Sequence, residues 1–264
     1  MPPDQYFALI IAVRMIVTAV FVLAATMTAE RAGPLVGGLV ATLPLGAGPV
    51  YVFLAHDHGA HFIAEGALNS LAINSVNVAF ALTYALLAQK RSLAVSLSGA
   101  LAVWFPLAWA VYEIQWTVVT AVLLNILVMG TCIALARPLR HVHFPRLRIY
   151  WTDLVLRAIM VATLVGITVT ASYYIGPAGS GIMAVFPIIL ISIMLILHRR
   201  IGGKPTAAVM ANGITGLVGF AFACLLLHYA ADAFGAVIGL SLALSTSIVW
   251  GLFVYFMRQR GFAL

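Results

Sequence analysis

Two arginines lie inside long apolar stretches of the chain. Arg14 and Arg157 each follow the start of an apolar run by about two helical turns, roughly 12 Å at about 1.5 Å per residue. A charge at that depth in a bilayer costs a few kcal/mol and faces the protein interior, a water-filled cavity or a partner. The pair is consistent with two anion-attracting gates that flank a central site. Structural roles are equally open, with Asp153 as a partner for Arg157 and Glu65 for Arg14.

Positions 56–65 carry the side chains of a possible metal site, namely His56, Asp57, His58, His61 and Glu65. His61 and Glu65 are four residues apart and share a helix face. Imidazole and carboxylate together suit zinc, nickel, cobalt or copper. The cluster matches no catalytic zinc motif such as His-Glu-x-x-His. Three interpretations are open: a metal site, a proton-sensing outer gate, or a solvated loop.

Both arginines belong to an internal repeat with an offset of 143 residues. Between positions 14 and 69, 13 of 56 residues recur at this offset without a gap. Seven of the recurring residues are types that are scarce in an apolar chain: Arg14/Arg157, Gly33/Gly176, Pro34/Pro177, Gly38/Gly181, Pro44/Pro187, Gly59/Gly202 and Asn69/Asn212. An offset this long favours a duplicated half-protein over a solenoid.

Proline and glycine interrupt one apolar run in each repeat at matching places. Pro34 and Pro177 suit the first turn of a helix. Pro44 and Pro187 follow ten residues later, where proline removes a backbone hydrogen bond and kinks or breaks the helix. Interrupted spans at corresponding positions of two halves indicate the solute site of a transporter. The alternative is a simple kink, with small residues for close helix packing.

Asparagines follow in the next span of each repeat. Asn69 and Asn212 form the matched pair, and we expect them to contribute polar contacts to the site. The first of these spans also carries Ser70, Asn74, Ser75 and Asn77. Polar residues in a membrane helix either line a path or hold helices together, and we expect the second role for the unmatched asparagines.

Composition identifies the elements that must position these residues. The chain of 264 residues is 64% hydrophobic and 8% charged, against about 45–50% and about 25% in soluble domains. Long apolar runs predict an all-α integral membrane protein. The net charge of +7 does not indicate nucleic-acid binding, because the basic residues lie in short links between apolar runs. The two cysteines lie inside apolar runs and imply no disulfide framework.

We predict nine transmembrane helices, at about 6–29, 34–55, 61–88, 92–112, 115–137, 151–174, 177–198, 205–230 and 233–257. Twelve of the 14 lysines and arginines then fall on one side. The exceptions are Arg14 and Arg157. The positive-inside rule places the N-terminus outside and the C-terminus inside.

The repeat and the topology together predict inverted repeats. Repeat one spans residues 1–112, a linking helix and a basic cytoplasmic loop span 113–148, and repeat two spans 149–264. Because a single helix separates the two four-helix repeats, the first helix of repeat two crosses the membrane in the direction opposite to that of the first helix of repeat one. The halves are therefore expected to be related by a pseudo-two-fold axis in the membrane plane, as in many secondary transporters.

The duplicated Gly-Pro-x-x-x-Gly…Pro pattern resembles that of uncharacterised bacterial integral membrane proteins, over about 33–80 and 176–223. The resemblance implies no activity. The sequence favours a secondary transporter of the inner membrane, with a midplane site for a small anion, and a coupling ion and a homo-oligomer are both open. We expect no cofactor and no enzymatic role. The alternatives are a divalent metal-ion transporter that uses His56–Glu65, a channel, and an intramembrane lipid enzyme.

Overall fold

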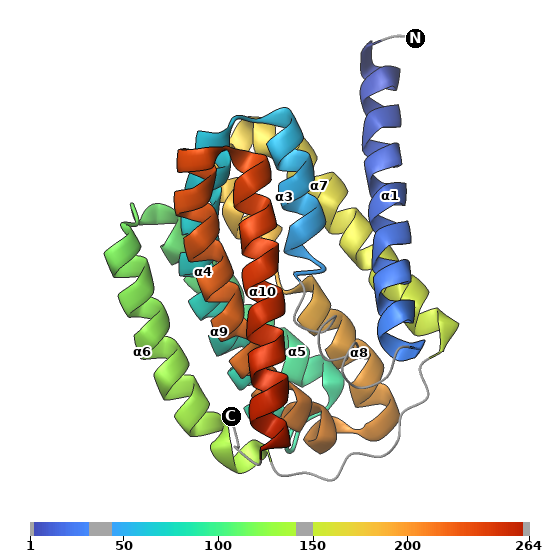
Figure 1. The fold of residues 1–264 in the computed structure, drawn as a ribbon. Coiled ribbons are helices and arrows are strands. Elements are labelled where there is room, and N and C mark those ends of the chain that lie inside the picture. Colours follow the sequence, from blue (N-terminus) through green and yellow to red (C-terminus); the bar gives the residue numbers. More distant parts are fainter. Residues whose placement is uncertain (1–2, 32–43, 141–149, 261–264) are drawn as a thin grey trace.

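The computed structural model describes residues 3–31, 44–140 and 150–260, and this part of the chain contains helices and no strand. The elements are α1 (Pro3–Arg31), α3 (Ala47–Asp57), α4 (Ala60–Leu87), α5 (Leu93–Glu113), α6 (Val118–Ala136), the 3-10 turn η1 (Arg137–Leu139), α7 (Trp151–Ala184), α8 (Ile188–Ile201), α9 (Gly203–Phe234) and α10 (Ala236–Gln259) (Figure 1). The prediction of an all-α fold is confirmed.

The long helices have the composition and length of membrane spans. Within the described ranges, seven stretches are long and apolar enough to cross a bilayer, and one of them, Trp151–Ile201, is 51 residues long. Large apolar side chains face outward, among them Trp109 (68% exposed) and Val237 (77% exposed). So much outward apolar surface suits hydrocarbon rather than water. The chain is therefore a multi-pass membrane protein.

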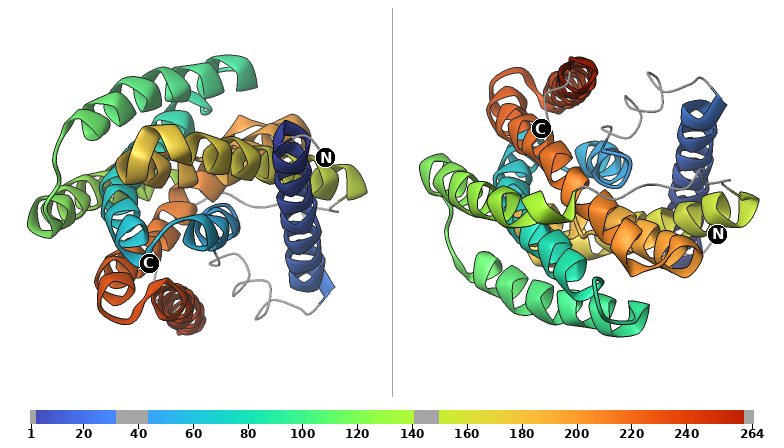
Figure 2. Two further views of the ribbon diagram at one scale, coloured as in Figure 1. Left: turned by 90° about the horizontal axis from the view of Figure 1, so that it is seen from above. Right: turned by 90° about the horizontal axis from the view of Figure 1, so that it is seen from below.

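Helix α4 forms the centre of the bundle. Its side chains are mostly buried, and it packs against α5, α6, α7 and α9. Small residues let these neighbours approach closely, as is usual between membrane helices. The closest packing partner of α4 is α9, and α10 in turn packs on α9. Helix α1 lies at the edge and packs mainly against α7 (Figure 2).

Helix α7 is bent, and a gap separates it from α8. Gly176 has a φ of 66°, a conformation that suits glycine, and the chain turns there. The helix then ends at Ala184, and α8 begins after Pro187. The predicted span 177–198 is thus two helical pieces, and the predicted break at Pro187 is confirmed. Pro44 likewise precedes α3, whereas Gly33, Pro34 and Gly38 lie outside the described residues.

The links gather at two ends of the bundle (Figure 1). The α4–α5 and α8–α9 links, the end of α6 with η1, and the start of α7 lie at one end. We call it the basic end because Lys90, Arg91, Arg137, Arg199 and Arg200 lie in these links or in the helix turns beside them. The α3–α4, α5–α6 and α9–α10 links lie at the opposite end. Helices α4 and α9 therefore run in opposite directions.

Candidate functional site

Two short helices begin in the middle of the bundle, α3 toward the opposite end and α8 toward the basic end (Figure 1). Their first turns meet. A Cβ atom added to Gly46, which precedes α3, would lie 3.3 Å from Cγ1 of Ile189 in α8. Neither helix has a side-chain cap, and neither has an acidic residue in its first turn. The first amide N–H groups of a helix have no partner within it, so two positive helix ends face each other here.

Asn77 binds the backbone where α7 stops. Its side-chain amide donates to the carbonyl of Val185 at 2.8 Å. Its oxygen accepts from the indole N–H of Trp104 at 2.8 Å, and the ring of Trp104 packs edge-on against Phe186 at 4.9 Å. A break in a membrane helix frees carbonyl groups that must find partners in the protein. Asn77 supplies one of these partners and fixes the break in place.

The short piece of α7 after Gly176 packs very closely on α4. Gly181 lies so near that an added Cβ atom would be 2.1 Å from the carbonyl oxygen of Gly66. The hydroxyl of Ser70 donates to the carbonyl of Gly181 at 2.7 Å and lies 2.7 Å from the hydroxyl of Tyr51 in α3. Since Ser70 uses its proton on Gly181, Tyr51 is the donor to Ser70. This network joins α3, α4 and α7.

The matched asparagines do not meet. Asn69 donates to the carbonyl of Glu65, and Asn212 donates to that of Ala208, each four residues earlier in its own helix. The two bonds are equivalent under the 143-residue offset. Asn69 lies in the half of α4 near the opposite end, and Asn212 lies in the half of α9 near the basic end. The pair therefore cannot contact one small solute together in this conformation.

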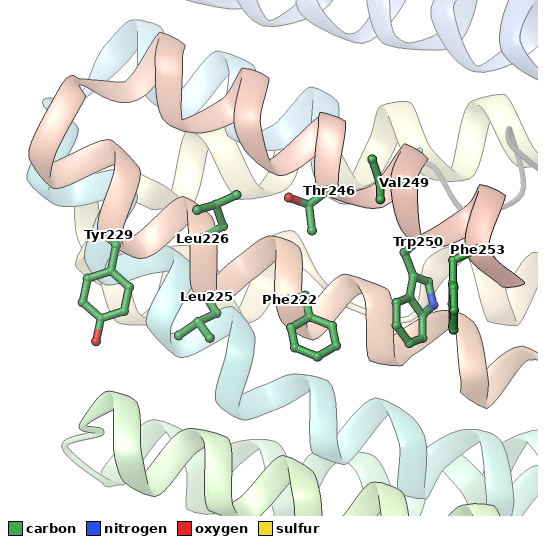
Figure 3. A pocket seen from close by; sticks show the side chains of 8 residues that line it. All are labelled: Phe222, Leu225, Leu226, Tyr229, Thr246, Val249, Trp250 and Phe253. Atoms are coloured by element: carbon green, nitrogen blue, oxygen red, sulfur yellow. The ribbon is translucent and has the colours of Figure 1, made fainter.

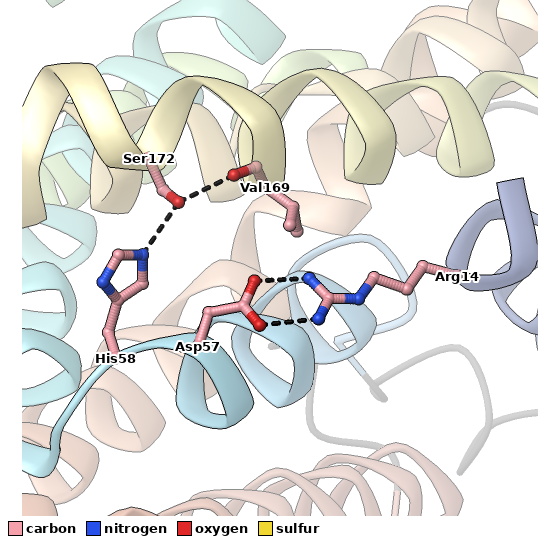
Figure 4. A network of polar contacts seen from close by, with 5 residues as sticks. All are labelled: Arg14, Asp57, His58, Val169 and Ser172. Atoms are coloured by element: carbon pink, nitrogen blue, oxygen red, sulfur yellow. Dashed lines mark hydrogen bonds and ion pairs between the residues drawn. The ribbon is translucent and has the colours of Figure 1, made fainter. Parts of the chain in front are cut away.

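Arg14 binds Asp57, a residue that sequence reasoning assigned to a different site. The guanidinium makes two hydrogen bonds to the carboxylate, one of them 2.6 Å long (Figure 4). It also lies over the ring of Phe53. Glu65, the partner expected for Arg14, does not make this contact. Burial raises the pKa of the Asp57 carboxyl, but the hydrogen bonds and the charge of Arg14 outweigh burial and hold this pKa below its usual value.

The remaining members of the 56–65 cluster have separate surroundings. The ring of His58 stacks on Phe62. Its Nε2 lies 2.9 Å from the hydroxyl of Ser172 (Figure 4). That hydroxyl donates to Val169, so His58 is the donor to it. His61 lies 3.3 Å from Asp232, and both side chains are exposed.

His56 is exposed in the last turn of α3, and Glu65 is partly exposed on α4. Among the residues that the structure describes, no three His, Cys, Asp or Glu side chains lie close enough together to hold a metal ion.

Asp153, the expected partner of Arg157, binds Arg200. A guanidinium nitrogen of Arg200 lies 2.5 Å from one Asp153 oxygen, and the other oxygen accepts from the backbone N–H of Tyr150. The guanidinium of Arg200 also lies 4.4 Å from the centre of the Tyr150 ring. Arg157 is half-buried one helical turn after Asp153.

An apolar groove runs along α9 and α10 (Figure 3). Its volume is about 570 Å³. Its walls are Phe222, Leu225, Leu226, Tyr229, Thr246, Val249, Trp250 and Phe253. Several of these side chains are half exposed on the outside of the bundle. The groove suits lipid acyl chains better than a small anion, because most of its walls are apolar and the donors of Thr246 and Trp250 are already used on the carbonyls of Leu242 and Thr215.

No family model, no curated protein and no solved structure matches the chain. The function must therefore be inferred from the geometry of the site. The expectation that the unmatched asparagines hold helices together is confirmed for Asn77. Sequence reasoning missed Ser70, Tyr51, Trp104 and Arg200 as parts of these polar contacts. The polar row along 69–77 was a signal for Ser70, but the contacts of Tyr51, Trp104 and Arg200 depend on the tertiary fold.

Proposed function

We propose that the chain is a secondary transporter that carries a small anion across the inner membrane by alternating access. Its site lies at mid-depth, between the start of α3 and the start of α8. The proposal includes nine membrane crossings. The stretch Trp151–Ile201 supplies two of them because it turns at Gly176. The predicted span 34–55, of which α3 is the main described part, supplies another.

Contacts between equivalent residues support inverted repeats. The side chain of Asn74 in α4 donates to the carbonyl of Leu217 in α9, and these residues are 143 positions apart. Gly46 and Ile189 are also 143 positions apart, and they lie so close that a Cβ atom added to Gly46 would be 3.3 Å from Cγ1 of Ile189. In a two-fold arrangement, equivalent residues meet only at the axis. Because α4 and α9 run in opposite directions, such an axis lies across the helices and thus in the membrane plane.

The observation that carries the function is the meeting of two helix N-termini without a negative side chain in either first turn. Each N-terminus has a partial positive charge of about half a unit, so the two ends repel each other. An anion between them would remove the repulsion and accept hydrogen bonds from first-turn amides such as those of Ile189 and Leu190 in α8. The amides of Gly48 and Ile188 already donate to the carbonyls of Pro44 and Phe186, and Pro49 has no N–H. Half-helix ends at the midplane bind anionic groups in other transporters built from inverted repeats.

The distribution of basic residues gives the orientation in the membrane, and the sequence motifs indicate what drives transport. The basic end faces the cytoplasm by the positive-inside rule, which places the N-terminus outside. No nucleotide-binding motif is present in the sequence, so an ion or solute gradient drives transport. Asn69 and Asn212 would then line the paths from the two faces to the centre.

A ligand screen by thermal unfolding tests the proposal. Purified protein is heated with inorganic anions, small organic acids and divalent metal ions, because a ligand of the folded state raises the melting temperature. We expect a shift with one class of small anion. Ala47→Asp should abolish the shift, because its negative charge would neutralise the positive end of α3 and repel an anion, whereas the uncharged control Ala47→Asn should keep most of it.

Other results would redirect the assignment. A shift with zinc, nickel or cobalt alone, lost when His56, His58 and His61 are replaced, would favour a metal-ion transporter. Unitary currents in a planar bilayer would favour a channel. Neither result is compatible with anion carriage at the helix ends.

A further inference from the structure

Two ion pairs occupy corresponding places in the two repeats. The offset of 143 residues maps Asp57 onto Arg200, and each lies at the outer end of a half-helix, α3 or α8. Asp57 binds Arg14 in α1, the first helix of repeat one. Arg200 binds Asp153 in α7, the first helix of repeat two. In each repeat, an ion pair thus ties the half-helix to the first helix.

The two pairs have similar surroundings and opposite polarity. The acid lies on the half-helix in repeat one, and the base lies there in repeat two. Each arginine also lies over an aromatic ring, Arg14 over Phe53 and Arg200 over Tyr150. The side chains of Arg14 and Asp57 are 12% and 6% exposed, and those of Arg200 and Asp153 are 27% and 11% exposed. Shielding from water strengthens both attractions.

The pairs lie at opposite ends of the bundle, while the inner ends of α3 and α8 meet at Gly46 and Ile189. A half-helix that is released at its outer end can move away from the first helix of its repeat. Movement of α3 would open the centre toward the opposite end only, and movement of α8 would open it toward the basic end only.

We propose that Arg14–Asp57 and Asp153–Arg200 are two latches, one for each face of the membrane, that open one at a time during transport. Both latches are closed in this structure. The inference rests on the proposed alternating-access function, because only such a protein must expose one central site to each face in turn.

Cysteine labelling tests the latches without any substrate. Ala47, 7% exposed at the start of α3, is replaced by cysteine in a background with Cys132→Ala and Cys224→Ala. A membrane-impermeant maleimide is then added to right-side-out and inside-out vesicles. The background protein should label slowly from both sides. Asp57→Asn should accelerate labelling about tenfold from the outside alone, and Asp153→Asn should do so from the inside alone.

The two variants are a matched pair, since both convert a carboxylate to an amide of the same shape. Asp153→Asn also keeps an oxygen for the backbone N–H of Tyr150. The exchange Arg14→Asp with Asp57→Arg should restore slow labelling. If Asp57→Asn alone does not fold, Arg14→Gln with Asp57→Asn leaves no unpaired charge and should open the same face.

Equal acceleration from both sides, or none in either variant, would overturn the latches. The outcome is separable from that of the proposed function. One-sided labelling in a protein that moves no solute would support the latches and contradict the transport function. Solute flux with unchanged labelling would support transport and contradict the latches.

Discussion

Gly181→Ala should destabilise the protein strongly, although alanine is the better helix former. The new Cβ atom would lie 2.1 Å from the carbonyl oxygen of Gly66, and the short piece of α7 would have to withdraw by more than an ångström to reach an ordinary contact. Overpacking of this kind costs about 1–3 kcal/mol. Withdrawal also weakens the hydrogen bond from Ser70, worth about 1 kcal/mol. We therefore expect a loss of about 3 kcal/mol.

Gly66→Ala is the matched control, because it adds the same methyl group on the other side of the same contact. Its Cβ atom would lie 3.5 Å from its nearest neighbours, which is ordinary packing, so the variant should be neutral or slightly more stable. A thiol-reactive dye that reports exposure of the buried Cys132 and Cys224 measures unfolding in detergent. The loss in Gly181→Ala should lower the melting temperature by roughly 6–12 °C. Equal stability of the two variants would refute the close approach of α7 to α4.

Two further predictions concern the break and the charged pair. Asn77→Ala should cost about 2–4 kcal/mol, because it leaves both the carbonyl of Val185 and the indole of Trp104 without their partner. Asn212→Ala removes a hydrogen bond from a half-buried side chain to the carbonyl of Ala208. This variant should cost less than half as much in the same unfolding assay. Asp57 has a lowered pKa in the folded state, so its stabilising contribution is present above the unfolded-state pKa of about 3.9 and is lost as the pH falls through the folded value. Melting temperatures measured from pH 6 to pH 3 should therefore fall more steeply for the wild type than for Asp57→Asn, and parallel curves would contradict this role of the ion pair.

The helices and their breaks could be predicted from local patterns. Long apolar runs gave most of the helices to within a few residues, and Pro187 marked the gap between α7 and α8. Proline acts through its own backbone, so its effect is visible in the sequence. The same holds for Gly176, whose positive φ accompanies the turn in α7.

The partners across helices could not be predicted in this way. Arg14 and Asp57 are 43 residues apart, and nothing local distinguishes Asp57 from Glu65 as the partner. The 143-residue offset did not reveal the second ion pair either. Position 57 is an acid and its equivalent, Arg200, is a base, so the two positions do not match by residue type. Contacts of this kind depend on which helices become neighbours in the fold. A sequence repeat identifies only those equivalent positions at which the same residue type recurs in both halves.

Anion exchange in proteoliposomes tests the central claim most directly. Liposomes that hold wild-type protein, Ala47→Asn or Ala47→Asp are loaded with unlabelled phosphate, acetate, lactate or citrate, and entry of the same radiolabelled anion is measured. The account predicts saturable exchange of at least one anion by the wild type and by Ala47→Asn, and little exchange by Ala47→Asp, whose negative charge would neutralise the positive end of α3. Equal exchange by all three proteins, or exchange of none of these anions, would contradict an anion site between the two helix ends.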